Sequence, residues 1–272
     1  MTIKTKNRLI FFLIFVSMAL ILTGLVTTGI FYFAGKITGP SSLPVLPLQG
    51  FFIFRYRFFC PIASVFVLLS YTFVTLLIIN IEFEKTQSSE ILFLAMFLVG
   101  CFAETARLAF PLLNLWDTNE NAAIFASRLV LAGRIISTAS ILFSAAYSSA
   151  EFRQYNEQNL AIIFVLGLVF ASFYPLNTSR MIPEGHFEWG YKNLLLSAQH
   201  VVIILSFILQ LAIRKGEKQN LMIPIGLLLL SIGYTFLNSA TNIFFLAAGT
   251  TIIIFGTSMY IRRLHNIYLW ND

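Results

Sequence analysis

Charged residues are scarce in this chain. Of its 272 residues, 11% are Asp, Glu, Lys or Arg, whereas 58% are hydrophobic. A typical soluble domain has about 25% charged and about 45–50% apolar residues. The shortage of charge excludes a sizeable soluble domain. It predicts an all-α, polytopic integral membrane protein that is surrounded by the lipid bilayer.

Cysteine and catalytic motifs are equally sparse. The two cysteines, Cys60 and Cys101, form no C-x-x-C pair, which excludes a disulfide framework. The chain contains no HExxH, GxSxG, P-loop or GxGxxG motif. We therefore predict no metal and no other cofactor, and the sequence favours a protein that is not an enzyme. The net charge of +6 fits basic loops at anionic lipid, so nucleic acid is not expected as a partner.

Long apolar runs are what the chain does contain. A membrane helix needs about 20 apolar residues, and eight segments approach or exceed this length: 9–33, 58–79, 91–113, 122–147, 160–176, 194–213, 221–237 and 243–261. The first segment is too long for a signal peptide, whose apolar core has about 7–15 residues. We interpret it as a retained signal anchor.

Three regions follow from this pattern. Residues 1–34 are interpreted as an N-terminal tail with the anchor helix. Residues 35–57 contain Gly, Pro and aromatic residues and are interpreted as an extracytoplasmic loop with an interfacial segment. Residues 58–272 are interpreted as a seven-helix membrane bundle with a short basic tail.

The distribution of Lys and Arg predicts the orientation. With eight spans, one side of the membrane receives ten basic residues and the other side receives five. Basic loops favour the cytoplasm, so both termini are predicted to be cytoplasmic, in the inner membrane if the organism is bacterial. The ten are Lys4, Lys6, Arg8, Lys85, Arg153, Arg214, Lys215, Lys218, Arg262 and Arg263.

The third and fourth segments carry charges inside their apolar runs. A charge at the centre of a membrane helix costs about 2.5–3.5 kcal/mol, so these side chains are expected to face the bundle interior. A histidine in the sixth segment lies at a similar depth. We predict an outward-facing pocket for a small anionic ligand, built by Glu104, Arg107, Arg128, Arg134 and His200.

Helical spacing limits how these charges can meet. Glu104 and Arg107 are three residues apart and share a face, so they can form an ion pair. Arg128 and Arg134 are about 120° apart around their helix. Three arginines for one carboxylate need further partners, which could be a backbone carbonyl, an anionic ligand or the acidic turn 117–120. The alternative is a buried charge network that fixes the helix register and binds no ligand.

The longest polar loop, 177–192, contains Glu184, His186 and Glu188. Alternating acid and imidazole groups could bind a metal, but three or four converging ligands are needed. We expect a solvated loop instead. Trp189 is expected to lie in an aromatic belt at the membrane interface.

Three functions remain open from the sequence. The first is a membrane-embedded sensor or signalling module, a layout that bacterial seven-helix sensory domains also use. It would act through a separate membrane or cytoplasmic partner that contacts the basic segments 214–218 and 262–272. The second is a transporter or permease subunit for a small anionic solute. The third is an integral-membrane enzyme that acts on lipid, with Glu104 and His200 as its acid–base groups.

Overall fold

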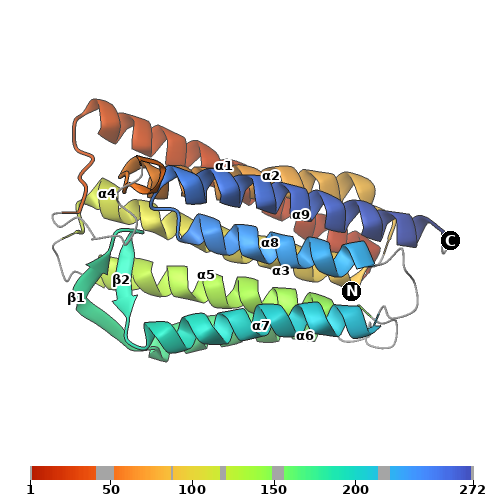
Figure 1. Ribbon diagram of the computed structural model, residues 1–272. Coiled ribbons are helices and arrows are strands. Elements are labelled where there is room, and N and C mark those ends of the chain that lie inside the picture. Colours follow the sequence, from red (N-terminus) through yellow and green to blue (C-terminus); the bar gives the residue numbers. More distant parts are fainter. Residues whose placement is uncertain are drawn as a thin grey trace.

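The computed structural model describes residues 2–40, 52–86, 88–116, 121–148, 156–213 and 221–270. These residues form long helices and one hairpin of two antiparallel strands (Figure 1). The helices are α1 (Ile3–Phe33), η1 (Phe52–Phe54), α2 (Phe59–Glu82), α3 (Ser89–Phe102), η2 (Ala103–Leu108), α4 (Ala109–Leu113), α5 (Asn121–Ala146), α6 (Asn156–Phe173), α7 (Lys192–Ile213), α8 (Met222–Asn238) and α9 (Ile243–Trp270). The strands are β1 (Leu176–Ile182) and β2 (His186–Trp189).

All eight predicted apolar segments are helical. Within the described residues, seven helices are long and apolar enough to cross a membrane, with α3, η2 and α4 forming one of them. The eighth apolar helix, α8, is shorter, at 17 residues. Helices predominate because apolar runs of this length satisfy their backbone hydrogen bonds internally.

The helix ends differ from the prediction at both ends of the chain. Helix α1 begins at Ile3, where Thr2 accepts a hydrogen bond from the backbone N–H of Thr5. Helix α9 continues to Trp270, so most of the predicted basic tail is helical. Residues 41–51 of the predicted loop and interfacial segment lie outside the described residues, and the described part that follows contains the short 3₁₀ helix η1.

The long helices run back and forth along one axis. Both ends of the chain lie at the same end of the bundle, and the hairpin of β1 and β2 lies at the opposite end (Figure 1). Helix α3 lies at the centre, with all but two of its fourteen residues buried. Helix α7 is peripheral, and its buried residues are Ile203, Ser206 and Gln210.

The first helix is fixed to the turn that follows α2. Lys6 Nζ donates hydrogen bonds to the carbonyl oxygens of Phe83 and Thr86. Asn7 Nδ2 donates to the carbonyl oxygen of Glu84 over 3.0 Å. These bonds satisfy backbone carbonyl groups of the turn and fix the register of α1 on the bundle.

Helices α3 and α5 approach each other closely at two glycines. A Cβ atom on Gly100 would lie 2.5 Å from the carbonyl oxygen of Gly133. Ser137 Oγ on α5 donates a hydrogen bond of 3.1 Å to the carbonyl oxygen of Phe97 on α3. Small residues allow this close approach, which brings Arg134 on α5 within reach of the segment that follows α3.

Candidate functional site

The site begins where the third apolar segment changes its winding. After Phe102 the α-helix continues as the 3₁₀ helix η2. A 3₁₀ helix has three residues per turn, so residues i and i+3 stack on the same side. Glu104 and Arg107 therefore lie one above the other, and Arg107 Nη1 is 3.3 Å from Glu104 Oε2. This confirms the ion pair predicted from their spacing.

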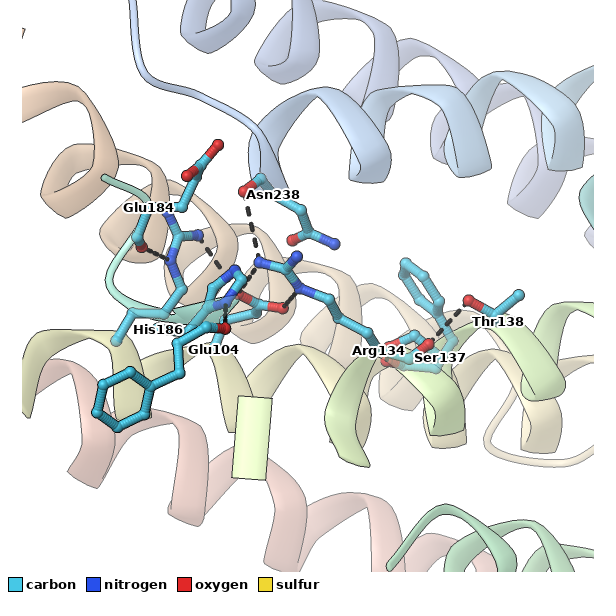
Figure 2. Close-up of polar contacts among 10 residues, drawn as sticks. Glu104, Arg134, Ser137, Thr138, Glu184, His186 and Asn238 are labelled. Atoms are coloured by element: carbon cyan, nitrogen blue, oxygen red, sulfur yellow. Dashed lines mark hydrogen bonds and ion pairs between the residues drawn. The ribbon is translucent and has the colours of Figure 1, made fainter. Parts of the chain in front are cut away.

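Arg134 reaches the same carboxylate from α5. Its Nε donates to Glu104 Oε1 over 2.9 Å and its Nη2 donates to Oε2 over 3.4 Å, a two-pronged contact (Figure 2). Glu104 is fully buried, Arg107 is 2% exposed and Arg134 is 11% exposed. One buried carboxylate thus holds two guanidinium groups.

Two backbone carbonyl groups complete the cluster. Arg107 Nε donates a hydrogen bond of 2.7 Å to the carbonyl oxygen of Glu184, in the turn of the hairpin. Arg134 Nη2 donates over 3.4 Å to the carbonyl oxygen of Asn238, at the end of α8 (Figure 2). The cluster of Glu104, Arg107 and Arg134 therefore ties η2, α5, α8 and the hairpin together. The acidic turn 117–120, a predicted source of partners, lies outside the described residues.

The cluster has more hydrogen-bonding capacity than its ion pairs use. Arg107 Nη2, Glu184 Oε2 and both amide atoms of the Asn238 side chain are buried and have no hydrogen-bond partner among the described residues. Buried polar atoms without partners are costly and uncommon in native proteins. A region with several of them is therefore a candidate for binding a polar group.

The hairpin corrects the expectation of a solvated loop. His186 and Trp189 are buried and stack on each other with ring centroids 4.4 Å apart and ring planes inclined by 11°. The guanidinium carbon of Arg134 lies 4.9 Å from the centre of the Trp189 ring, a cation–π contact. Trp189 therefore covers the charge cluster and is not a residue of an exposed aromatic belt.

Packing against α5 contributes to the burial of the hairpin. The backbone N–H of Phe187 donates a hydrogen bond of 2.9 Å to Ser127 Oγ on α5.

Burial also affects the protonation of His186. It lowers the pKa of His186 well below its ordinary value, and the nearby positive charge of Arg134 adds to this effect. His186 is therefore a neutral ring at neutral pH.

The other two predicted site residues lie elsewhere. Arg128 is half-buried on α5 and forms no ion pair with Glu104. His200 is exposed on α7, and its Nδ1 bonds to the carbonyl oxygen of Leu196 over 2.6 Å. The structure brings together Glu104, Arg107 and Arg134 but neither of these two residues. Equal depth along a helix does not fix the direction in which a side chain points.

A cavity of about 240 Å³ adjoins the cluster between α5, α6 and α7. Arg134 is the member of the cluster that lines it, in agreement with its partial exposure. Trp189, Thr138 and Gln199 also line it, and most of the remaining wall is aliphatic or aromatic. This arrangement can hold a small apolar molecule that carries a hydrogen-bond acceptor.

Sequence reasoning missed several parts of the site. The backbone carbonyl groups of Glu184 and Asn238 leave no sequence signal, because every residue has a carbonyl group.

Within the described residues, no group of three or more His, Cys, Asp or Glu could hold a metal ion. Comparisons with protein-family models, with curated proteins and with solved structures find no match. The function is therefore inferred from the geometry of the chain itself.

Proposed function

We propose that the chain is an integral membrane protein with eight spanning helices and cytoplasmic termini that works as a ligand sensor. A small molecule from the outer side of the membrane binds in the cavity beside Arg134. A separate partner protein then binds differently to the ligand-bound and the ligand-free chain. The observation that supports this proposal is the position of Arg134, which is held by Glu104 and also lines the cavity.

The chemistry of the cavity defines the ligand class. A guanidinium group binds a carboxylate or carbonyl oxygen well, and this interaction is stronger where water is excluded. Pockets for drug-sized ligands measure about 300–1,000 Å³, so a cavity of about 240 Å³ fits a smaller molecule. We infer a short apolar chain or ring that ends in a carboxylate.

The cluster also offers a route for the signal. Arg134 contacts Trp189 of the hairpin and the carbonyl group of Asn238, the last residue of α8. A ligand that engages Arg134 would compete with these contacts and shift α8 and the connected helix α9. Helix α9 ends at the opposite end of the bundle (Figure 1), where the proposed partner would bind.

A binding experiment tests the cavity. In detergent, hexanoate is expected to raise the unfolding temperature of the full chain, because a ligand stabilises the state that binds it. Hexanol, with the same chain and no charge, is expected to act less. Ala198 lines the cavity, so Ala198→Phe should remove the hexanoate effect. Val201→Phe is the matched control, since Val201 is exposed on α7 and does not line the cavity.

Equal stabilisation of the wild type and Ala198→Phe would contradict the proposed cavity. The signalling part has a separate test, which is capture of the full chain from its native membrane. If no kinase, cyclase or other membrane protein is captured with it, the signalling role is wrong and only ligand binding remains.

One observation favours transport as the second candidate. Gln199, Ser206 and Gln210 follow one face of α7 from the cavity toward the other end of the bundle. Ser206 and Gln210 are buried, and both amide atoms of Gln210 lack a hydrogen-bond partner among the described residues. A permease for a small anionic solute would need such a polar path. Uptake of labelled hexanoate into proteoliposomes that is abolished by Gln210→Leu would favour transport.

The enzyme alternative depends on Glu104 and His200 acting together. Glu104 is buried under two guanidinium groups, whereas His200 is exposed on α7. This separation of Glu104 and His200 gives the enzyme alternative less support than the sensor proposal.

A further inference from the structure

We propose a second binding site, in a groove between α2 and α9, for a phospholipid with a primary ammonium in its headgroup. This proposal rests on the membrane insertion proposed above but not on the sensor role. The groove has a volume of about 620 Å³, and the described residues that line it belong to α2 and α9. It is separate from the cavity beside Arg134, which lies between α5, α6 and α7.

The groove has the dimensions of a lipid chain. Its wall on α2 extends from Phe66 to Glu82, a length of about 24 Å at 1.5 Å per residue. One hydrocarbon leaflet is about 15 Å thick, so an acyl chain fits along it. Val74 and Ile254 form exposed apolar walls. A hydrogen bond of 2.7 Å between Tyr71 Oη and Thr257 Oγ1 joins the two helices.

Two opposite charges lie at one end of the groove. Glu82 is the last residue of α2, and Arg262 lies near the end of the apolar part of α9. Both line the groove, yet they form no ion pair with each other among the described contacts. Glu82 Oε2 is also buried without a hydrogen-bond partner among the described residues.

This pair of charges selects a headgroup. The planar guanidinium of Arg262 matches a phosphate group. The carboxylate of Glu82 matches a group that carries positive charge and donates hydrogen bonds. Phosphatidylethanolamine supplies both. Phosphatidylglycerol has no cation for Glu82, and the quaternary ammonium of phosphatidylcholine cannot donate a hydrogen bond. The charges therefore favour an ethanolamine lipid over the other two.

Native mass spectrometry of the purified full chain tests the proposal. After delipidation, the chain is titrated with phosphatidylethanolamine, phosphatidylcholine and phosphatidylglycerol of identical acyl chains. We expect phosphatidylethanolamine to bind about tenfold more tightly than phosphatidylglycerol, the effect of one charge-assisted hydrogen bond. Glu82→Gln should abolish this preference, and Arg262→Gln should weaken the binding of all three lipids.

Two further variants make the result specific. Arg263→Gln changes the neighbouring arginine, which does not line the groove, and should leave binding unchanged. Ser70→Trp places a large ring in the groove at an exposed position and should reduce binding without altering either charge. If Glu82→Gln or Arg262→Gln does not fold, Ser70→Trp still decides whether lipid binds in the groove.

Several outcomes would overturn the proposal. Equal binding of the three lipids by the wild type, or an unchanged preference in Glu82→Gln, would show that Glu82 and Arg262 do not distinguish between headgroups. A dimer that Ser70→Trp dissociates would assign the groove to a second copy of the chain. A chain absent from the membrane fraction would instead refute the membrane insertion, which is a distinct failure.

Discussion

Among single residues, Glu104 has the largest expected effect on stability. Its carboxylate compensates both Arg107 and Arg134. Glu104→Gln keeps the shape but leaves two buried guanidinium groups without their counter-charge. Breaking a buried ion pair from one side costs about 3–5 kcal/mol. We expect a loss of this size in the free energy of unfolding, measured by SDS titration in mixed micelles.

The ion pair of Arg180 and Glu188 provides a matched control. These two side chains are 3.5 Å apart, and Arg180 is 74% exposed. An exposed ion pair contributes about 0–1 kcal/mol, so Glu188→Gln should have little effect. If Glu104→Gln were as mild as this control, Glu104 would not be the counter-charge that stabilises the two arginines.

The burial of His186 predicts how the free energy of unfolding depends on pH. The pKa of His186 is lowered in the folded protein, whereas the unfolded chain takes up a proton near pH 6.5. The unfolded state then binds more protons below pH 6.5, so stability decreases as the pH falls through this range. Above about pH 7 this contribution is constant. One proton limits the slope to about 1.4 kcal/mol per pH unit.

Thermal unfolding at pH 8, 6.5 and 5 measures this contribution. The comparison is with His186→Phe, which keeps a ring against Trp189 but cannot take up a proton. The wild type should lose more stability than the variant between pH 6.5 and pH 5. Parallel pH profiles of the two proteins would show that His186 is not buried as a neutral ring.

At the scale of elements, the contact of α5 with α3 and η2 tolerates little added volume. A Cβ atom on Gly133 would lie 2.4 Å from Ala103 Cβ and 2.6 Å from the carbonyl oxygen of Gly100. Backbone atoms cannot move aside easily, and overpacking typically costs about 1–3 kcal/mol. Gly133→Ala should therefore destabilise the protein and displace Arg134, the next residue. Melting in detergent measures the loss.

Gly29 in α1 is the control for this substitution. A Cβ atom there would meet no heavy atom within 4 Å. Alanine has a helix propensity about 1 kcal/mol better than that of glycine, so Gly29→Ala should be neutral or slightly stabilising. If both variants melted alike, the close approach of α3 and α5 would not constrain the fold.

The elements also show how far sequence reasoning reaches. The length and the composition of an apolar run can both be read from the local sequence. All eight helical segments were therefore predictable. The hairpin of β1 and β2 was not predictable, because its aromatic residues are buried by packing on segments distant in the sequence, such as α4 and α5. The switch to the 3₁₀ helix η2 leaves no signal either, since Ala103–Leu108 reads as ordinary helix.

The same division holds for the site. The spacing of Glu104 and Arg107 predicted their ion pair, because three residues along one helix fix a shared face. The placement of Arg128 and His200 depends on how whole helices rotate about their axes. That rotation is set by packing partners such as Gly100 and Gly133, which no single segment reveals. The ligand-binding roles of all five residues remain predictions.

At the scale of the whole molecule, the proposed orientation depends on α8. Its 17 residues span about 26 Å, slightly less than the 30 Å of a hydrocarbon core. Both termini lie at one end of the bundle and the hairpin lies at the other (Figure 1). If α8 crosses the membrane, both termini share one side and the hairpin lies on the opposite side.

Cysteine labelling tests this orientation in a background in which the two buried cysteines, Cys60 and Cys101, are replaced by alanine. Lys4, Arg180 and Asn266 are exposed and accept single cysteines in that background. In intact host cells a membrane-impermeant maleimide should label Arg180→Cys, in the hairpin, and neither of the other two. Lys4→Cys and Asn266→Cys should react only after permeabilisation, since basic ends are retained in the cytoplasm. Labelling of Asn266→Cys in intact cells, with Lys4→Cys still protected, would mean that α8 does not cross the membrane. The proposed route from the cavity to a cytoplasmic partner would then be wrong.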